Sequence, residues 1–205
     1  MSDQKRPYRK KRRAELEAQT RRRITESAVA LHGSVGPART SMSAVAERAG
    51  VRRSTLYRHF PDEGALFEAC SSHWAAANPP PDISAWAEIR DPDERVREAL
   101  EQLYAYYGRT ERMMANLIRD EQVNPHVRKH FAAFHAFMEA ARDVLLAGHG
   151  LRGRARDRVA GAIGHALSFV TWRSLVREQG LDPDAAVELM CELVAACERA
   201  PARAA

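Results

Sequence analysis

Apolar residues in the first third of the chain recur every three or four positions, which is the spacing of one face of an α-helix. Ile24, Ala28 and Leu31 lie on such a face. Gly36 and Pro37 follow, and a glycine and a proline at these positions do not continue a helix. The pattern therefore predicts a first helix that ends a few residues before position 37.

Two short helical segments come next, separated by a glycine. Ser41 has the side chain of a helix N-cap, and Gly50 can adopt the positive φ that ends the segment after it. A second short helix is predicted from about Arg53, with Leu56 and Phe60 spaced i, i+4 on its inner face. Two short helices joined by a tight glycine turn are the outline of a helix-turn-helix motif.

A proline-rich stretch, NPPP at residues 78–81, is the strongest break in the pattern, because consecutive prolines cannot continue a helix. We place a domain boundary there, between residues 18–78 and residues 79–205. Beyond the break the pattern is helical throughout, including a long helix expected over residues 154–179 and a last one over 182–199. No segment alternates with period two, so the predicted fold class is all-α.

The composition is that of a globular protein, with 45% hydrophobic and 29% charged residues among 205. No stretch approaches the roughly 20 uncharged apolar residues of a membrane helix, and the basic N-terminus does not resemble a secretory signal. Cys70, Cys191 and Cys197 form no CxxC pair, which argues against a disulfide framework or a zinc–cysteine site. We expect a cytoplasmic protein that does not span a membrane.

The charge is unevenly distributed along the chain. Residues 1–60 contain 15 Lys or Arg and 5 Asp or Glu, whereas the remainder contains 17 and 22. This polarity indicates that one end meets a polyanion, with nucleic acid and an anionic membrane both open at this point. Residues 5–13, KRPYRKKRR, are broken by Pro7 and have no apolar face. We interpret residues 1–17 as a disordered basic arm, which either follows a nucleic-acid backbone or serves only solubility.

The segment over residues 41–67, SMSAVAERAGVRRSTLYRHFPDEGALF, resembles the TetR family of transcriptional regulators. The resemblance is strongest in AERAGV and in STLYRHF, and it extends over about residues 18–70, a quarter of the chain. It implies a helix-turn-helix domain whose partner is double-stranded DNA and not a membrane. It also implies a homodimer, since two-fold DNA sites call for a two-fold protein.

A recognition helix must expose short donors and bases on one face while its other face packs. With Leu56 and Phe60 inward, Arg53 is the best candidate for base readout, because a guanidinium can donate two hydrogen bonds to guanine. The Tyr57 hydroxyl suits a phosphate, and the resemblance implies DNA contacts at Thr55, Tyr57 and His59. The predicted DNA-binding residues are Ser43, Arg52, Arg53, Ser54, Thr55, Tyr57, Arg58 and His59.

Two positions depart from the family pattern. Glu63 stands where the family usually has a lysine that meets the DNA backbone, and Asp62 beside it is also acidic. Acidic residues in the first turn of a helix instead suit its dipole. His32 stands where the family usually has a buried aromatic residue. The acidic residue at position 63 removes a phosphate contact that the family makes there.

In the helical remainder the resemblance implies that the last two helices dimerise and that the middle helices enclose an effector pocket. Gly161 and Gly164 would let two helices approach closely, although ordinary packing within one chain explains them equally well. Methionine and aromatic side chains suit an adaptable apolar pocket, but such a stripe is more often core. The candidate effector-binding residues are Tyr104, Tyr107, Met113, Leu117, Phe134, Met138, His165, Phe169 and Trp172.

The sequence contains no glycine-rich phosphate loop, nucleophile elbow or paired-carboxylate motif, so we expect neither an enzyme nor a cofactor. His126 and His130 are spaced i, i+4, but no cysteine or acid pattern completes a metal site with them, and we predict none. The leading hypothesis is a repressor released from a palindromic operator by a small, largely apolar effector. The alternative is a constitutive or partner-controlled DNA-binding protein without such an effector.

Overall fold

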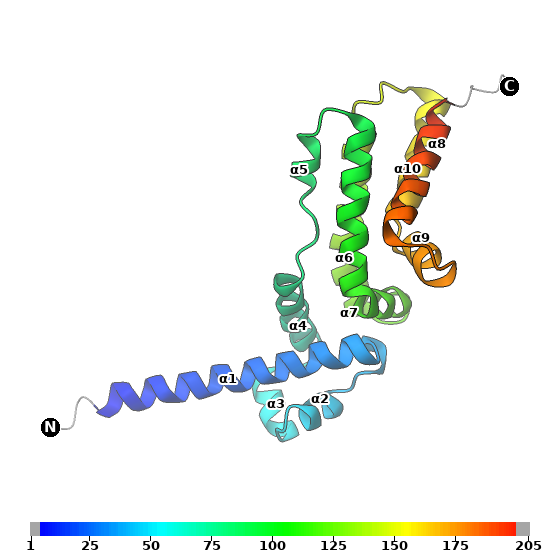
Figure 1. Ribbon diagram of the computed structural model, residues 1–205. Coiled ribbons are helices and arrows are strands. Elements are labelled where there is room, and N and C mark those ends of the chain that lie inside the picture. Colours follow the sequence, from blue (N-terminus) through cyan, green and yellow to red (C-terminus); the bar gives the residue numbers. More distant parts are fainter. Residues whose placement is uncertain (1–4, 200–205) are drawn as a thin grey trace. The chain divides into compact units, whose positions relative to one another are not determined.

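The computed structural model describes residues 5–199, and every regular element within this range is helical (Figure 1). The all-α prediction is therefore confirmed. The chain divides into two compact units. The first unit comprises the chain up to Pro79 together with Ala115–His130, and the second comprises Pro80–Met114 and the chain from Phe131 onward. The domain boundary predicted at residues 78–79 places residues 115–130 in the C-terminal domain, whereas in the structure they belong to the same unit as the N-terminal segment.

The first helix, α1 (Lys5–Ser34), differs from the expected disordered arm, because residues from Lys5 onward belong to it; residues 1–4 of the arm lie outside the described range. Pro7 stands in the first turn of α1, where a helix needs no backbone N–H from it. The basic residues that follow are interspersed with Ala, Glu, Leu and Gln, which are all good helix formers. The charge run is therefore one end of a continuous helix.

The other elements of the first unit are short. A 3₁₀ turn, η1 (Pro37–Arg39), leads into α2 (Met42–Arg48), α3 (Arg53–His59) and α4 (Glu63–Ala77). The helices α2 and α4 both pack against α1 (Figure 1).

One hydrophobic core holds the first unit together. Ile24 of α1, Leu56 of α3 and Phe60 have no exposed surface. Val127, near the start of α7, is buried in the same cluster, and Leu117, near the end of α6, packs against it. Residues 115–130 are therefore part of this core and not an appendage to it.

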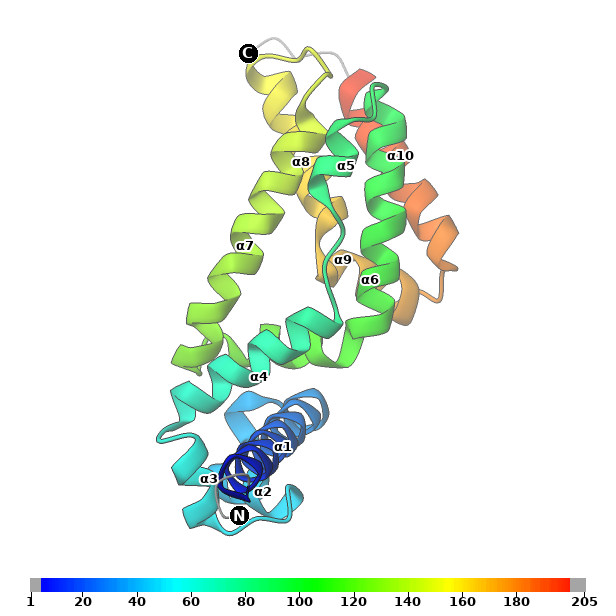
Figure 2. The ribbon, with the colours of Figure 1, turned by 90° about the vertical axis from the view of Figure 1, so that its left-hand side faces the viewer.

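The second unit is built from the greater parts of α6 and α7 together with four further helices and a π-helical turn. Their bounds are α5 (Ile83–Ala87), α6 (Pro92–Asp120), α7 (Pro125–Leu146), α8 (Gly153–Leu167), α9 (Phe169–Arg173), η2 (Ser174–Glu178) and α10 (Pro183–Arg199). The helix α5 lies beside α6 (Figure 1 and Figure 2), where the indole Nε1 of Trp86 donates to Oε1 of Gln102 at 3.0 Å. α8 packs against α10. None of the helices in the described range is long and apolar enough to cross a membrane.

The long helix predicted over residues 154–179 is interrupted at Ser168, which has extended backbone angles. The break leaves the carbonyl groups at the end of α8 without helical partners. Two buried hydroxyl groups of α6 bind them: Tyr104 Oη donates to the Ala166 carbonyl at 2.9 Å, and Tyr107 Oη donates to the Leu167 carbonyl at 2.7 Å. The interruption is thus stabilised by side chains about 60 residues away in the sequence.

Candidate nucleic-acid interface

The turn between α2 and α3 follows directly from its local sequence. The Ser41 side chain accepts a hydrogen bond from Ala44 N at 3.1 Å and so caps α2. Gly50 has φ +62°, and its N–H donates to the Glu47 carbonyl at 3.0 Å. Because a left-handed residue here costs glycine nothing, the chain reverses sharply and α3 begins three residues later. The helix-turn-helix outline predicted from the sequence has this structural basis.

The helix α3 has two chemically distinct faces. Leu56, His59 and the following Phe60 are buried, and they form the face that packs within the first unit. The opposite face is polar and open. The exposed residues among those predicted to contact DNA are Ser43 on α2 and Arg52, Arg53, Ser54, Tyr57 and Arg58, with Thr55 half-buried.

Arg53 and Tyr57 lie one helical turn apart and contact each other on this exposed face. Arg53 Nη2 donates to Tyr57 Oη at 3.5 Å, and the guanidinium carbon is 5.8 Å from the centroid of the tyrosine ring. Exposed contacts of this kind are weak, so either side chain can exchange its partner for a base or a phosphate at small cost. The pair places a bidentate donor and a hydroxyl group side by side.

His59 differs from the sequence prediction, because its side chain faces inward and not toward solvent. Residues 56, 59 and 60 fall on one stripe of the helix, and this stripe packs in the first unit. Burial and the neighbouring Arg58 lower the pKa of His59. From α1, Arg21 Nη1 donates to the His59 carbonyl at 2.6 Å, and its guanidinium covers the Phe60 ring at 4.1 Å. Arg21 therefore holds the end of α3 against α1 through the His59 carbonyl and the Phe60 ring.

The basic end of α1 adds exposed positive charge to the first unit. Lys10, Lys11, Arg12 and Arg13 are all exposed. Because they lie on a helix, their spacing is fixed, which a flexible arm would not provide.

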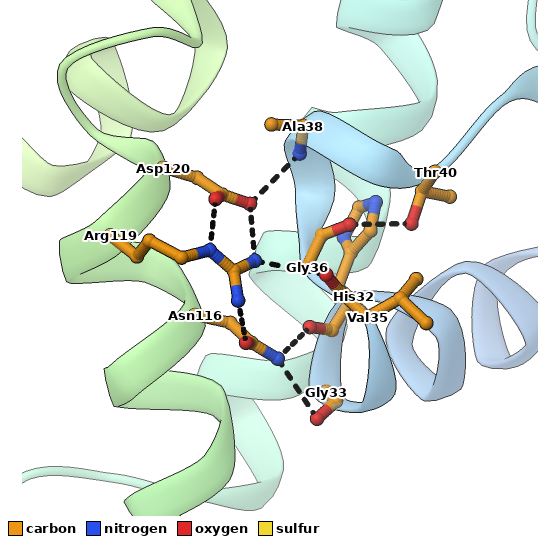
Figure 3. Close-up of polar contacts among 9 residues, drawn as sticks. All are labelled: His32, Gly33, Val35, Gly36, Ala38, Thr40, Asn116, Arg119 and Asp120. Carbon is orange, nitrogen blue, oxygen red and sulfur yellow. Dashed lines mark hydrogen bonds and ion pairs between the residues drawn. The ribbon is translucent and has the colours of Figure 1, made fainter.

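The carboxyl end of α6 is joined to the end of α1 by polar contacts that the sequence analysis did not anticipate (Figure 3). The buried side chain of Asn116 donates from Nδ2 to the carbonyls of His32 at 2.9 Å and Gly33 at 3.0 Å. The last carbonyls of a helix lack partners within the helix. The Asn116 amide satisfies two of them.

Arg119 and Asp120 complete this connection (Figure 3). Arg119 Nη2 donates to the Val35 carbonyl at 2.9 Å, and Arg119 Nε donates to Asp120 Oδ1 at 2.7 Å. The Asp120 carboxylate, almost fully buried, also accepts from Ala38 N at 2.9 Å. Burial alone would raise the pKa of Asp120, but the hydrogen bonds from Arg119 and Ala38 outweigh it and lower the pKa. Asp120 is therefore held as a carboxylate.

Gly36 allows this approach between α6 and the end of α1. Its φ is +95°, and a Cβ at this position would overlap the Arg119 guanidinium and the Asp120 carboxylate. These partners are more than 80 residues apart in sequence. No local sequence pattern predicts such a contact, so the sequence around Gly36 indicates only the end of a helix.

Comparisons with known proteins agree with this geometry. Residues 24–70 match a family model described as bacterial regulatory proteins, tetR family. The matched segment spans about the last third of α1, all of α2 and α3, and the first part of α4. The chain contains the DNA-binding domain of the TetR family. It is accordingly a DNA-binding transcriptional regulator, and its helix-turn-helix is the element described above.

Solved structures support the fold beyond the TetR domain. A TetR-like transcriptional regulator from Rhodococcus sp. RHA1 superposes with a TM-score of 0.60 at 21% identity, over 85% of this chain and 93% of that chain. NalD from Pseudomonas aeruginosa, described as the secondary repressor of the MexAB-OprM multidrug efflux pump, gives 0.58 at 20% identity, over 89% and 97%. At these identities the likeness shows the shared fold alone. The comparison with curated proteins finds no match.

Asp62 and Glu63, where this TetR-type domain departs from the pattern, have a local structural role. Asp62 Oδ1 accepts from Ala65 N at 2.7 Å and caps α4, and Glu63 stands in the first turn of that helix. Both carboxylates therefore favour the start of α4 through its dipole. His32, the other departure, is buried with its Nδ1 3.4 Å from Cys70 Sγ and its ring 5.5 Å from Phe67. Burial lowers the pKa of His32 to about 4.

The residues predicted to bind an effector do not all lie together. In the second unit, Tyr107 contacts Phe169 edge-on at 5.3 Å and Trp172 at 5.8 Å between ring centroids. Tyr104 belongs to the same aromatic cluster, and Met138 Sδ is 3.8 Å from Tyr107 Oη. The structure thus gathers five of the nine candidates around one aromatic cluster.

The other four candidates are placed differently. Phe134 stacks on Phe131 at 4.9 Å, and Met113 is half-buried on α6. Leu117 packs against the core of the first unit, because α6 crosses from one unit into the other before this residue. His165 is exposed, with Nδ1 3.3 Å from Thr171 Oγ1. Leu117 and His165 therefore differ from the placement that the sequence suggested.

Proposed function

We propose that this regulator is a repressor that binds a palindromic operator as a homodimer and leaves it when a small, largely apolar effector binds. The observation that supports DNA reading best is the exposed polar face of α3, centred on Arg53 and Tyr57. These two side chains contact each other only weakly. A bidentate donor beside a hydroxyl suits one base contact and one phosphate contact.

Exposed apolar residues at the end of the chain support the homodimer. Leu189 and Leu193 are one turn apart on α10 and are 41% and 37% exposed. On α8, a Cβ built at the exposed Gly161 meets nothing within 4 Å, so another helix can approach there. A paired two-fold surface would cover these residues and set the spacing of two recognition helices.

Release by an effector is supported by the contacts of Asn116, Arg119 and Asp120 with the end of α1. These three residues lie on α6, and both α6 and the following helix α7 have most of their length in the second unit. A ligand that prefers one arrangement of α6 would shift the population of forms in which these hydrogen bonds are made. We expect the ligand to be largely apolar, because aromatic and methionine side chains surround Tyr107.

The DNA-reading claim is tested by substituting Arg53. A preferred duplex would first be selected from a random library, and affinity measured by fluorescence anisotropy on that duplex and on unrelated DNA. Arg53→Ala should cost ~1–3 kcal/mol on the preferred duplex and relax the preference at one base pair. The control is Arg112→Ala, which removes an exposed arginine of α6. Equal losses on both DNAs would show that Arg53 contacts only the backbone.

The effector claim is tested separately, with a panel of small apolar compounds. A true effector should raise the melting temperature of the protein and release the selected duplex at the same concentrations. If none does both while sequence-specific binding persists, the protein is a constitutive or partner-controlled DNA-binding protein. The two experiments can therefore fail independently.

A further inference from the structure

The first half of α1 projects from the core of the first unit and continues past α2 and α3 (Figure 1). Ile24 is the first buried residue among the described side chains of this helix, and every described side chain before Thr20 is exposed. We call residues 8–19 the projecting segment, which is ~18 Å long at ~1.5 Å per residue. Its large apolar residues, Tyr8 and Leu16, are 66% and 55% exposed, so it does not pack into the core.

The positive charges farthest from the core have no partner within the described protein. Lys10–Arg13 is a run of exposed cations, and none of them makes a hydrogen bond or ion pair with another described residue. Closer to the core, Arg21 instead donates to the His59 carbonyl, and Arg22 forms an ion pair with Glu26. The run Lys10–Arg13 is therefore available to an anionic partner.

This placement of charge opposes helix formation. The N-terminus of a helix is the positive end of its dipole, so cations there are unfavourable. The first turn of α1 contains no acidic residue, and residues 5–23 contain ten Lys or Arg and two Glu. Like charges three or four positions apart, such as Lys10 and Arg13, also repel each other. A polyanion bound along the projecting segment would offset both costs and stabilise the helix.

A groove runs between α1 and α3 at the base of the projecting segment. It is lined by Arg13, Leu16, Glu17 and Thr20 of α1 and by Arg58 and His59 of α3. The four α1 residues lie on one stripe of the helix, and Lys10 lies one turn further along it. Beside the groove, Arg21 Nη1 donates to the His59 carbonyl at 2.6 Å. The direction of the segment is thus fixed with respect to α3.

We propose that the projecting segment binds the phosphate backbone of the same duplex that α3 reads, a role that rests on the DNA binding proposed for α3. Duplex DNA carries one negative charge per ~1.7 Å of its axis, so a basic helix of this length lies beside several phosphates. Glu15 and Glu17 stand at the core end of the segment, which places the contact on residues 8–13. Backbone contacts of this kind add affinity without reading sequence.

An anionic membrane is the other polyanion that a basic helix can meet. Helices that lie in a membrane surface bury a large apolar face. Tyr8 and Leu16 are the only large apolar residues of the projecting segment, and they do not form a continuous face. The groove shared with α3 continues the DNA-reading surface instead. Charge and position together therefore favour DNA.

The first test neutralises the charge run in the full-length protein. With Lys10, Lys11, Arg12 and Arg13 all replaced by Gln, anisotropy titrations at several salt concentrations would be made on the selected duplex with flanking DNA and on unrelated DNA. The slope of log affinity against log salt should become shallower by about 2–4, and affinity at about 0.1 M salt should fall roughly tenfold or more on both DNAs.

The matched control removes the same charge from exposed arginines of the second unit. These are replaced by Gln in one variant: Arg97, Arg112, Arg152 and Arg154. The control should keep the slope of the unsubstituted protein. An unchanged slope in the α1 variant, or an equal reduction in both variants, would overturn the proposal, because net charge and not the position of the charges would then determine binding.

A second variant tests the helix while keeping every charge. Ala14 is exposed, and Ala14→Pro interrupts the helix between the core and the charge run. Its affinity and salt slope should fall toward those of the neutralised variant, whereas Ala14→Gln, which keeps the helix, should bind as the unsubstituted protein does. Equal binding by Ala14→Pro and Ala14→Gln would contradict a contact that depends on the fixed direction of α1.

Two further measurements separate this proposal from its competitors. Binding to vesicles of phosphatidylcholine and phosphatidylserine would be measured with the same variants, and a loss confined to vesicles would assign the segment to a membrane and refute the DNA contact. The base preference of the neutralised variant should match that of the unsubstituted protein, since Arg53 remains. If the unsubstituted protein has no preference, DNA reading by α3 fails, while the salt slope on unrelated DNA still tests the α1 contact.

Discussion

The exposed face of α3 and the aromatic cluster around Tyr107 both consist of residues singled out for binding, yet the structure uses them in opposite ways. Arg53 and Tyr57 are exposed, and among the described residues the only hydrogen-bond partner of either side chain is the other. Tyr104 and Tyr107 are buried, and both hydroxyl groups are bonded to backbone carbonyls at the end of α8. The first pair is free to meet a partner, whereas the second pair already stabilises the fold.

This difference teaches how a binding residue can be distinguished from a core residue. A side chain without an internal role can be changed at little cost in stability, so its loss appears in binding. A buried hydroxyl bonded to a carbonyl leaves that carbonyl unpaired when it is removed, so its loss appears in stability. A ligand that entered this aromatic cluster would bind beside the tyrosine hydroxyl groups or compete with the bonds that they make.

The largest expected effect comes from the buried residue His32. It tests whether the interior of the first unit excludes water, in contrast to the exposed face of α3. His32 is buried, which lowers its pKa to about 4. The unfolded chain takes up a proton at this residue as the pH falls through 6.5, whereas the folded chain stays neutral until about pH 4. The stability contributed by His32 is therefore complete above pH 6.5 and is lost between pH 6.5 and 4, by ~3 kcal/mol.

Urea unfolding at several pH values in this window measures that loss. In His32→Phe, which keeps an aromatic ring beside Phe67, the slope of stability against pH should be shallower than in the unsubstituted protein. His73 is exposed, so His73→Gln should leave the slope unchanged. If His32→Phe has the same slope as the unsubstituted protein, then His32 is hydrated in solution and the core of this unit is more open than the structure indicates.

The next effect concerns the aromatic cluster. Tyr107→Phe removes the donor to the Leu167 carbonyl and leaves that buried group unpaired. The free energy of unfolding should fall by ~1–3 kcal/mol, as measured by chemical denaturation. Affinity for the selected duplex, measured at a temperature where the variant is folded, should not change. A variant with full stability but altered response to an effector would reverse the comparison and make Tyr107 a binding residue.

The elements that sequence predicted well are those whose causes are local. Ser41, Gly50 and Leu56 lie within sixteen residues of one another and between them determine the cap, the turn and the packed face of the helix-turn-helix. The face opposite Leu56 was expected to be open, and it is. The spacing of Leu56 and Phe60 predicts an exposed His59, but position i+3 lies on the same stripe of the helix as i and i+4, and His59 is buried with them.

The features that the sequence analysis missed depend on contacts between distant segments. The helix break at Ser168 is stabilised by Tyr104 and Tyr107, and nothing near residue 168 marks it beyond a serine. The contact of Asp120 with Ala38 N spans 82 residues. Pro7 was read as a helix breaker, although proline is well tolerated in a first turn. The DNA-contacting face can thus be predicted from neighbouring residues alone. The unit to which residues 115–130 belong depends on contacts with distant segments, so only the structure shows it.

The smallest expected effect comes from Tyr57→Phe, which makes on the exposed face of α3 the same chemical change that Tyr107→Phe makes in the aromatic cluster. Tyr57→Phe removes a hydroxyl whose only described partner is Arg53, so the free energy of unfolding should change by no more than ~0.5 kcal/mol. DNA affinity should fall by ~1 kcal/mol if the hydroxyl donates to a phosphate.

A phosphate contact carries no sequence information, so this loss should be equal on the selected duplex and on unrelated DNA, in contrast to the loss in Arg53→Ala. Anisotropy titrations on both duplexes, paired with denaturation of the same samples, measure the two quantities together. A fall in stability with unchanged DNA binding would mean that Tyr57 packs as Tyr107 does, and the distinction between the two regions would then rest on Arg53 alone.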